Sequence, residues 1–155
     1  MSKIETDVEQ ADAPTASLLL DDQMCFALYA AQRAMTNRYR PLLDEFNLTY
    51  PQYLVMLVLW EHGALPIKTL GTLLQLDYGT LTPLLKRLEA NGLIRRERQA
   101  SDERSVQITL TTQGAELRER ARAVPAAIGD AVGFSDRKIA DIKSLLELLT
   151  ASLHN

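Results

Sequence analysis

The sequence has little cysteine and histidine, with one cysteine and two histidines among 155 residues. A single cysteine excludes an intramolecular disulfide framework and is typical of a reducing, intracellular setting. So few sulfur and imidazole ligands also argue against a zinc site, and no other pattern indicates a cofactor. We therefore expect a cytoplasmic protein without a metal or a cofactor.

Long hydrophobic runs and enzyme motifs are missing as well. The longest apolar run, Tyr53–Trp60, has eight residues, whereas a membrane-spanning helix needs about 20. The N-terminus has no basic segment followed by an apolar stretch, so no secretory signal is predicted. The sequence contains no Gly-x-Ser-x-Gly, no His-Glu-x-x-His and no glycine-rich phosphate loop. These absences argue against a membrane protein and against an enzyme.

Acidic side chains concentrate at the beginning of the chain. Residues 1–22 carry six acids and one lysine, whereas the remaining residues hold 16 basic and 14 acidic side chains. Between Lys86 and Arg104 there are six basic side chains and four acidic ones. A local basic surface can bind phosphates on an acidic chain, because the field of a charge falls off within about 8–10 Å. The net charge of −3 therefore does not exclude a nucleic-acid partner.

The order of the predicted elements indicates one domain, residues 18–155, after a flexible acidic tail at residues 1–17. Apolar residues at helical spacing predict helices over residues 21–43, 51–61, 67–74 and 79–91. Asp21 or Asp22 is expected to cap the first helix, and Thr49 or Tyr50 the second, with Pro51 at its first position. Gly92 is expected to end the fourth helix.

Residues 79–110 have the pattern of a DNA-reading helix followed by a hairpin. In the helix, Leu81, Leu84, Leu85 and Leu88 recur at i, i+3, i+4 and i+7 and must face the core, while small, hydroxylated and basic residues face outward. Two strands are predicted at residues 93–98 and 105–110, joined by a turn over residues 99–104. A mainly α fold with a small β-hairpin wing, a winged helix-turn-helix over residues 50–110, is expected.

The C-terminal part predicts helices that pack against a second subunit. Thr111 or Thr112 opens a helix that continues to Ala123, and Ser135 caps a last helix in which Phe134 staples onto Ile139. The last helix has a long apolar line: Ile139, Ile142, Leu145, Leu146, Leu149 and Leu153. Packing within its own domain is the alternative, but a monomer would expose this stripe. We expect a homodimer formed through the N- and C-terminal helices, residues 18–47 and 111–155.

Three stretches of this sequence resemble the MarR family of winged-helix repressors. They are residues 48–61 (LTYPQYLVMLVLWE), residues 76–89 (LDYGTLTPLLKRLE) and Asp102-Glu103-Arg104. The segment Gln23-Met24-Cys25-Phe26-Ala27-Leu28-Tyr29 further resembles the organic-hydroperoxide-sensing branch, known as OhrR. The likeness covers roughly residues 20–150. It implies a transcriptional repressor that senses an organic hydroperoxide through Cys25 and then releases its operator.

Cys25 has two interpretations. A lone cysteine is usually a small buried hydrophobic residue. Its predicted place in the first turn of a helix favours a thiolate, although the adjacent carboxylates oppose it. The resemblance implies that tyrosine hydroxyls bond the cysteine sulfur, and the matching positions are Tyr39 and Tyr50, with Tyr29 nearby.

Helix geometry adds a constraint on that sensor site. Cys25 and Tyr39 are 14 residues apart in sequence, which is about 21 Å along a helix. Tyr39 therefore cannot touch Cys25 of its own chain while both lie on one helix. If it reaches the sulfur, it must come from a partner subunit.

The resemblance also implies the chemistry. The Cys25 thiolate attacks the O–O bond of an organic hydroperoxide and becomes a sulfenic acid. Phe26, Met56 and Trp60 either favour alkyl hydroperoxides or are ordinary core residues. Many members resolve the sulfenic acid with a second cysteine, and here Asp130 takes that place. A mixed disulfide with a low-molecular-weight thiol is the expected route, with a sulfenamide or over-oxidation as the alternatives.

The DNA surface is expected on the fourth helix and the hairpin, although such charged residues are often only a solvated face. The helix would enter the major groove by its N-terminal end, and Gly79 permits a close approach. In the wing, the Asp-x-Arg pattern of the family that the sequence resembles implies that Arg104 reaches into a minor groove with Asp102 orienting it. Arg96 would contact a phosphate. The expected partner is double-stranded DNA with a pseudo-palindromic operator. The candidates are Asp77, Tyr78, Thr80, Thr82, Lys86, Arg87, Arg96, Asp102 and Arg104.

Two other functions remain open from the sequence. The first is a MarR-type repressor released by a small phenolic or aromatic ligand, with Cys25 structural. The second is a thiol peroxidase, which no enzyme motif supports.

Overall fold

The computed structural model describes residues 16–154, so most of the expected tail at residues 1–17 lies outside the described residues. The chain forms two compact units, one ending at Met35 and the other beginning at Thr36. The first helix, α1 (Met24–Asp44), belongs to both.

The unit ending at Met35 begins with a short 3-10 helix, η1 (Leu20–Asp22), followed by the first part of α1. The expectation that Asp21 or Asp22 caps the first helix is wrong, because both lie in η1 and α1 begins at Met24. The hydroxyl of Ser17 donates to the Asp22 carboxylate at 2.5 Å. This local bond uses the carboxylate in the preceding turn, as short polar side chains often do outside helices.

The larger unit holds the end of α1 and α2 (Tyr50–His62). Thr49 caps α2 with a complete capping box. The Gln52 N–H donates to the Thr49 hydroxyl at 3.4 Å, and the Thr49 N–H donates to Gln52 Oε1 at 2.9 Å. The prediction that Thr49 caps this helix is confirmed, whereas Pro51 is its second residue rather than the first. The predicted end of the first helix near Leu43 is also close to the observed end, even though Pro41 lies inside it.

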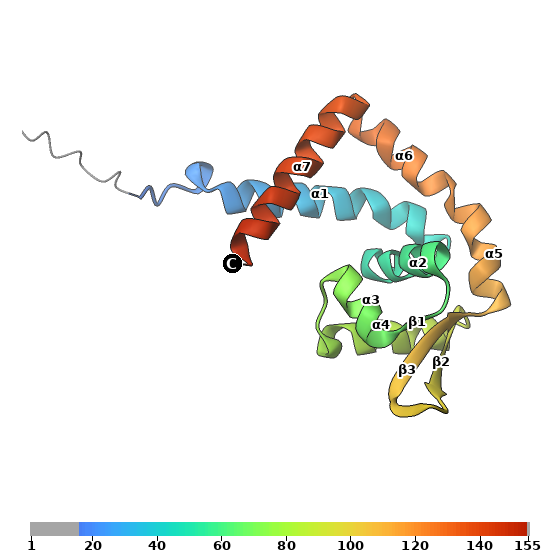
Figure 1. The fold of residues 1–155 in the computed structure, drawn as a ribbon. Helices are drawn as coiled ribbons and strands as arrows, with labels where there is room; N and C mark the ends of the chain where they lie inside the picture. Colours follow the sequence, from blue (N-terminus) through green and yellow to red (C-terminus); the bar gives the residue numbers. More distant parts are fainter. Residues whose placement is uncertain (1–15, 155) are drawn as a thin grey trace, which may run out of the picture. The chain divides into compact units, whose positions relative to one another are not determined.

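Two further helices, α3 (Ile67–Leu74) and α4 (Tyr78–Ala90), form the helix-turn-helix (Figure 1). Gly92 has φ 75° directly after the Asn91 C-cap, so the predicted helix stop is confirmed. Leu81, Leu85 and Leu88 of α4 are fully buried. They pack with residues of α2 and α3 in the hydrophobic core.

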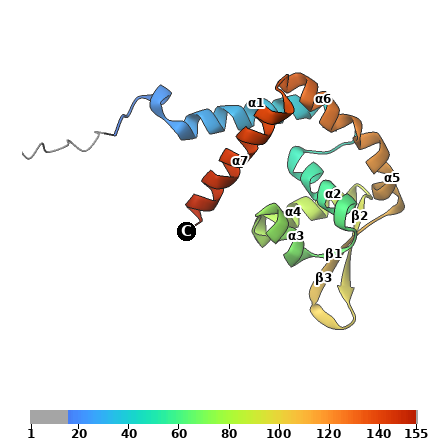
Figure 2. The same cartoon turned by 45° about the horizontal axis from the view of Figure 1, so that its top comes forward.

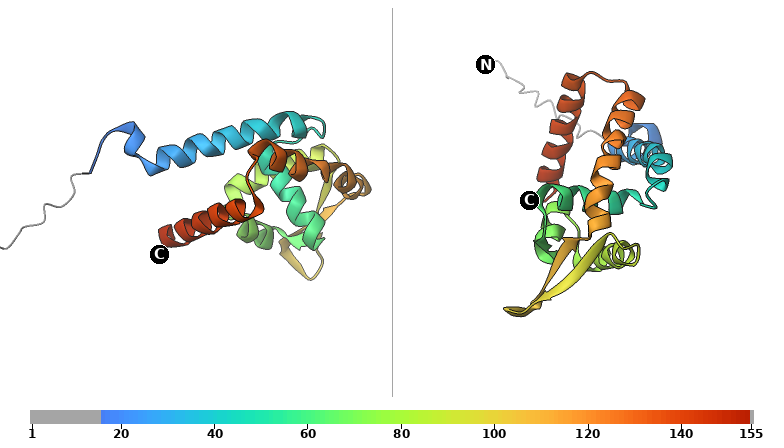
Figure 3. Two further views of the ribbon diagram at one scale, coloured as in Figure 1. Left: turned by 90° about the horizontal axis from the view of Figure 1, so that it is seen from above. Right: turned by 90° about the vertical axis from the view of Figure 1, so that its right-hand side faces the viewer.

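The sheet has three antiparallel strands, β1 (Leu65–Pro66), β2 (Ile94–Gln99) and β3 (Asp102–Leu110), in the order β1-β3-β2. The β2–β3 hairpin, called the wing below, extends away from the helices of this unit (Figure 3, right). The predicted turn over residues 99–104 is too long, because pairing continues to Gln99 and Asp102 with a register shift beside Arg98. The sequence does not reveal β1, which has only two residues and contains a proline.

Three helices follow the wing: α5 (Thr112–Ala121), α6 (Ala123–Val132) and α7 (Asp136–Leu153) (Figure 2). Thr111 and Ser135 cap α5 and α7 as predicted. The helix predicted to reach Ala123 ends at Ala121, and α6 begins two residues before Pro125, where proline fits a first turn. The described part of the chain contains no helix with the length and hydropathy of a membrane span.

Close contacts join α2, the wing and α5 at one place, which we call the junction. The Trp60 indole donates to the Gly114 carbonyl at 2.9 Å, and the Thr111 hydroxyl donates to the Gly92 carbonyl at 2.6 Å. A Cβ on Gly114 would lie 2.0 Å from the Leu93 carbonyl oxygen. Only glycine allows α5 to approach the beginning of the wing this closely.

We expect Gly114→Ala to lower the free energy of unfolding by at least about 2 kcal/mol, because its methyl group meets fixed backbone. Gly129→Ala is the matched control, since Gly129 is also helical and its Cβ would meet nothing within 4 Å. That control should change stability by less than about 1 kcal/mol. Urea unfolding followed by circular dichroism measures both, and equal stability of the two variants would contradict the assigned junction.

Candidate functional site

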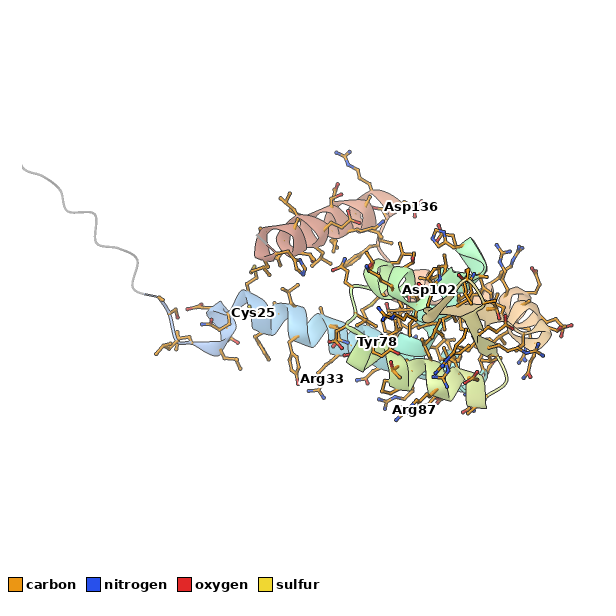
Figure 4. All side chains as sticks on the ribbon, turned by 60° about the horizontal axis from the view of Figure 1, so that its bottom comes forward. Cys25, Arg33, Tyr78, Arg87, Asp102 and Asp136 are labelled. Atoms are coloured by element: carbon orange, nitrogen blue, oxygen red, sulfur yellow. The ribbon has the colours of Figure 1, made fainter. Side chains whose placement is uncertain are left out.

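The N-terminal end of α4 exposes several of the predicted DNA-binding residues. Tyr78 is 64% exposed as the first residue of the helix, and it is labelled with Arg87 in Figure 4. The Asp77 carboxylate caps the helix, accepting the Thr80 N–H at 2.7 Å. Hydrogen bonds from Thr80 lower the pKa of Asp77, so its carboxylate is charged at neutral pH. The Thr82 hydroxyl donates to the Tyr78 carbonyl at 2.8 Å.

These contacts show which of the predicted residues bond within the helix and which are exposed to a partner. Asp77 and Thr82 use their polar groups within the helix, whereas Tyr78 is exposed to solvent. Lys86 and Arg87, further along α4, are exposed. A helix that exposes an N-terminus, an aromatic ring and two cations is suited to an anionic groove.

The tip of the wing is ordered by a local turn at the beginning of β3. The Asp102 carboxylate accepts the backbone N–H of Arg104 at 3.0 Å. Asp102 therefore orients Arg104 through the main chain, and both side chains are exposed. Beside this turn, the side-chain amides of Gln99 and Gln107 bond across the two strands.

Arg96 is in the middle of β2 and is bound to α4. Its backbone N–H and its guanidinium both bond the Glu89 carboxylate. Sequence reasoning did not identify Glu89 as a partner, because the two residues belong to different elements seven positions apart. The expected phosphate contact of Arg96 stays a prediction.

Cys25 is the second residue of α1, and it is a free, exposed thiol. It is labelled near the beginning of the helix in Figure 4. Tyr29 lies one turn further along and is 56% exposed. Arg33 donates to the Tyr29 hydroxyl at 3.2 Å, with its guanidinium 5.4 Å from the ring centroid. Sequence reasoning missed Arg33, although its i, i+4 spacing from Tyr29 is a signal for such a contact.

Tyr39 and Tyr50, the other two predicted sensor residues, are in contact in the larger unit. Their ring centroids are 4.7 Å apart. A third ring that the sequence did not single out, Tyr53, lies 5.9 Å from Tyr39 and 6.4 Å from Tyr50. We call these three residues the tyrosine cluster. The i, i+3 spacing of Tyr50 and Tyr53 was visible in the sequence. Tyr53 was not singled out because it belongs to the apolar run Tyr53–Trp60.

Burial and the neighbouring rings raise the pKa of Tyr39 to about 12. Burial likewise raises the pKa values of Tyr50 and Tyr53. All three hydroxyls therefore stay protonated at neutral pH. A protonated phenol can donate a hydrogen bond to an anionic sulfur or oxygen, which a phenolate cannot do.

The three residues expected either to favour alkyl hydroperoxides or to be ordinary core residues differ in their environments. Met56 is fully buried in the core, so ordinary packing accounts for it. Trp60 is half-buried and bonds Gly114. Phe26 is 39% exposed. Among the described residues, no group of three or more His, Cys, Asp or Glu side chains is placed to hold a metal ion.

A helix-turn-helix followed by a two-stranded wing defines a winged-helix protein. The family model described as "Transcriptional regulator SarA/Rot" matches residues 37–120. The chain is 51% identical over 135 residues to the organic hydroperoxide resistance transcriptional regulator of Bacillus subtilis, a match covering 87% of this chain and 92% of that protein.

Solved structures of a related regulator agree with this fold. Reduced AbfR bound to DNA has a TM-score of 0.75 and 39% identity, covering 87% of this chain and 92% of that one. The disulfide form of AbfR has a TM-score of 0.60 at the same identity, covering 87% and 90%. The chain belongs to the MarR-type winged-helix transcriptional regulators and to the SarA/Rot family among them.

The raised tyrosine pKa values predict an alkaline loss of stability. Unfolded tyrosine ionises near pH 10, whereas folded Tyr39 keeps its proton until about pH 12. Ionisation therefore favours the unfolded state, so the free energy of unfolding should fall between these pH values. Urea unfolding from pH 8 to 12 should show this fall, and Tyr39→Phe should reduce it.

The matched control for that series is Tyr78→Phe, which removes an exposed hydroxyl outside the tyrosine cluster. It should leave the pH dependence unchanged. Equal effects of Tyr39→Phe and Tyr78→Phe would contradict the burial of the Tyr39 hydroxyl.

Proposed function

We propose that this protein is a homodimeric repressor that binds a pseudo-palindromic DNA operator and releases it when an organic hydroperoxide oxidises Cys25. The observation that carries the proposal is the exposed thiol of Cys25 near the N-terminus of α1. It occurs in a chain 51% identical to a regulator named for organic hydroperoxide resistance.

The DNA part of the proposal is supported by exposed groups on α4 and the wing. Tyr78, Lys86 and Arg87 of α4 are exposed, as is Arg104 at the wing tip. The related structure in its reduced form is described as bound to DNA. We assign the major groove to the N-terminal end of α4 and the minor groove to Arg104.

The dimer is supported by the unpartnered apolar side chains of α7. None of its described residues is buried, and Leu145, Leu148 and Leu153 are 68–75% exposed. A second copy would cover them, since soluble monomers rarely expose such a stripe. In a two-fold dimer the two copies of α4 would contact half-sites about 34–36 Å apart.

The sensor site is supported by the tyrosine cluster and by the helix that carries Cys25. Tyr39 and Tyr50 keep their hydroxyl protons at neutral pH, so they can donate to the sulfur. Cys25 and Tyr39 both belong to α1, which is continuous from Met24 to Asp44. We propose that Tyr39 serves the Cys25 of the partner subunit, so that each sensor site is built by two chains.

The chemical step is a two-electron oxidation of the sulfur. The Cys25 thiolate attacks the terminal oxygen of the hydroperoxide, the O–O bond breaks, and the alcohol leaves after taking up a proton. The resulting sulfenic acid condenses with a low-molecular-weight thiol and releases water, giving a mixed disulfide. The sequence has no second cysteine for an internal disulfide, and Asp130 is exposed.

Operator binding measured by fluorescence anisotropy tests the redox half. Cumene hydroperoxide, added with a small thiol, should release the wild type but not Cys25→Ser, and a reductant should restore binding. Mass spectrometry of the released protein should find one added thiol on Cys25. Release of both proteins by a phenolic ligand, with no effect of the peroxide, would replace this proposal by the ligand-released repressor.

The same titration without peroxide tests the DNA half. We expect Arg104→Ala to weaken operator binding at least tenfold, which is about 1.4 kcal/mol. Arg118→Ala is the matched control, because Arg118 is exposed on α5, outside the proposed surface. Equal affinities of both variants and the wild type would remove the wing from the proposed interface.

A further inference from the structure

Glu89 and Arg96 connect α4 to the wing through three contacts. Glu89 Oε1 accepts the backbone N–H of Arg96 at 3.1 Å. Glu89 Oε2 accepts Nε of Arg96 at 2.8 Å and lies 2.8 Å from its Nη2. One carboxylate thus holds both the main chain and the side chain of a single wing residue. We call this pair the wing clamp.

Arg96 differs from the arginines beside it on the same strand. Arg95 and Arg98 are exposed, whereas the Arg96 side chain is 31% exposed and its Glu89 partner 35%. A cation that has a carboxylate partner contributes little net charge to a phosphate-binding surface. The exposed neighbours are therefore better placed than Arg96 to attract DNA.

The position of Glu89 in its helix also needs an explanation. It is the penultimate residue of α4, where the negative end of the helix dipole disfavours a carboxylate. The hydrogen bonds from Arg96 lower the pKa of Glu89 and compensate this unfavourable position.

The clamp lies where the wing meets the core. Arg96 pairs in register with Ile108, and both Ile108 and Ile94 are buried. From this fixed point the hairpin continues to its tip at Asp102. A change of angle at the clamp would move Arg104 relative to the N-terminal end of α4, and a small tilt there displaces the far tip.

We propose that Arg96 is a positioning residue: together with Glu89 it fixes the wing at the angle to α4 that lets both reach their grooves at once. This inference rests on the proposed DNA-binding function. It assigns to Glu89 a role in operator binding, although a carboxylate cannot itself attract a phosphate. It also replaces the phosphate contact expected of Arg96 from the sequence.

Removing the charge of Glu89 distinguishes a positioning role of Arg96 from a phosphate contact. If Arg96 contacted a phosphate, Glu89→Gln would free it and binding would stay equal or tighten. The wing clamp instead predicts that Glu89→Gln weakens operator binding about threefold to tenfold. Glu97→Gln is the matched control, because it removes the same charge from an exposed position on β2. The control should bind at least as tightly as the wild type.

A second variant, Arg96→Lys, tests the wing clamp whether or not Glu89→Gln folds normally. Lysine keeps the charge that a phosphate needs but cannot bond the carboxylate in the same two-pronged way. The clamp predicts that Arg96→Lys binds as weakly as Arg96→Gln. A phosphate contact instead predicts that Arg96→Lys, which keeps the charge, binds nearly as tightly as the wild type.

Fluorescence anisotropy, with thermal unfolding of each variant, decides between the roles. Weakened operator binding by both Glu89→Gln and Arg96→Lys, each folded, supports the clamp. Wild-type affinity of Arg96→Lys, or undiminished affinity of Glu89→Gln, overturns it while the proposed function stands. Absence of operator binding by the wild type would instead refute the proposed function.

Discussion

The close approach of α5 to the beginning of the wing is the constraint on which the larger unit depends. Gly114 leaves no space for a side chain against the Leu93 carbonyl, and Trp60 of α2 bonds the Gly114 carbonyl. Thr111 completes the junction through its bonds to Gly92 and Leu93. α5 and the wing thus meet through backbone atoms, which cannot yield by a change of rotamer, and α2 joins them through the Trp60 side chain.

This junction gives the proposed regulation a physical route. The helix α7, which exposes several leucines, follows α5 and α6 in the chain, and we propose that it packs against a second subunit. The wing, which precedes α5 in the chain, carries the proposed DNA contact at Arg104. If oxidation of Cys25 changes how two subunits pack, the rigid junction carries that change to the wing. The energetic requirement is modest, since a loss of about 1.4 kcal/mol weakens binding tenfold.

The sequence predicted the helices well where local chemistry decides. The capping box at Thr49 and Gln52, the positive φ of Gly92 and the leucine spacing in α4 all leave local signals. It failed at η1, where a bond from Ser17 to Asp22 sets a different helix start. It also missed β1, since two residues have no periodicity and their pairing depends on distant β3.

The candidate site shows the same limit. Cys25, Tyr39 and Tyr50 were found because they match a family pattern, and their residue types carry the chemistry. Tyr53, Arg33 and Glu89 were missed because their importance arises from contacts: Tyr53 with the other two tyrosines, Arg33 with Tyr29 and Glu89 with Arg96. Helical spacing offered a signal for the first two contacts, and none for the third. Glu89 is the clearest example, since its hydrogen-bonded partner Arg96 lies in another element.

Mixed dimers test most directly whether each sensor site combines Cys25 of one chain with Tyr39 of the other. One dimer pairs a Cys25→Ser chain with a Tyr39→Phe chain; the other pairs a wild-type chain with a chain carrying both changes. The rate of Cys25 oxidation by cumene hydroperoxide is measured in each. A shared site predicts wild-type rates for the cysteine of the first dimer and slow oxidation in the second. The reverse order would contradict the account, because it would place Tyr39 beside the cysteine of its own chain.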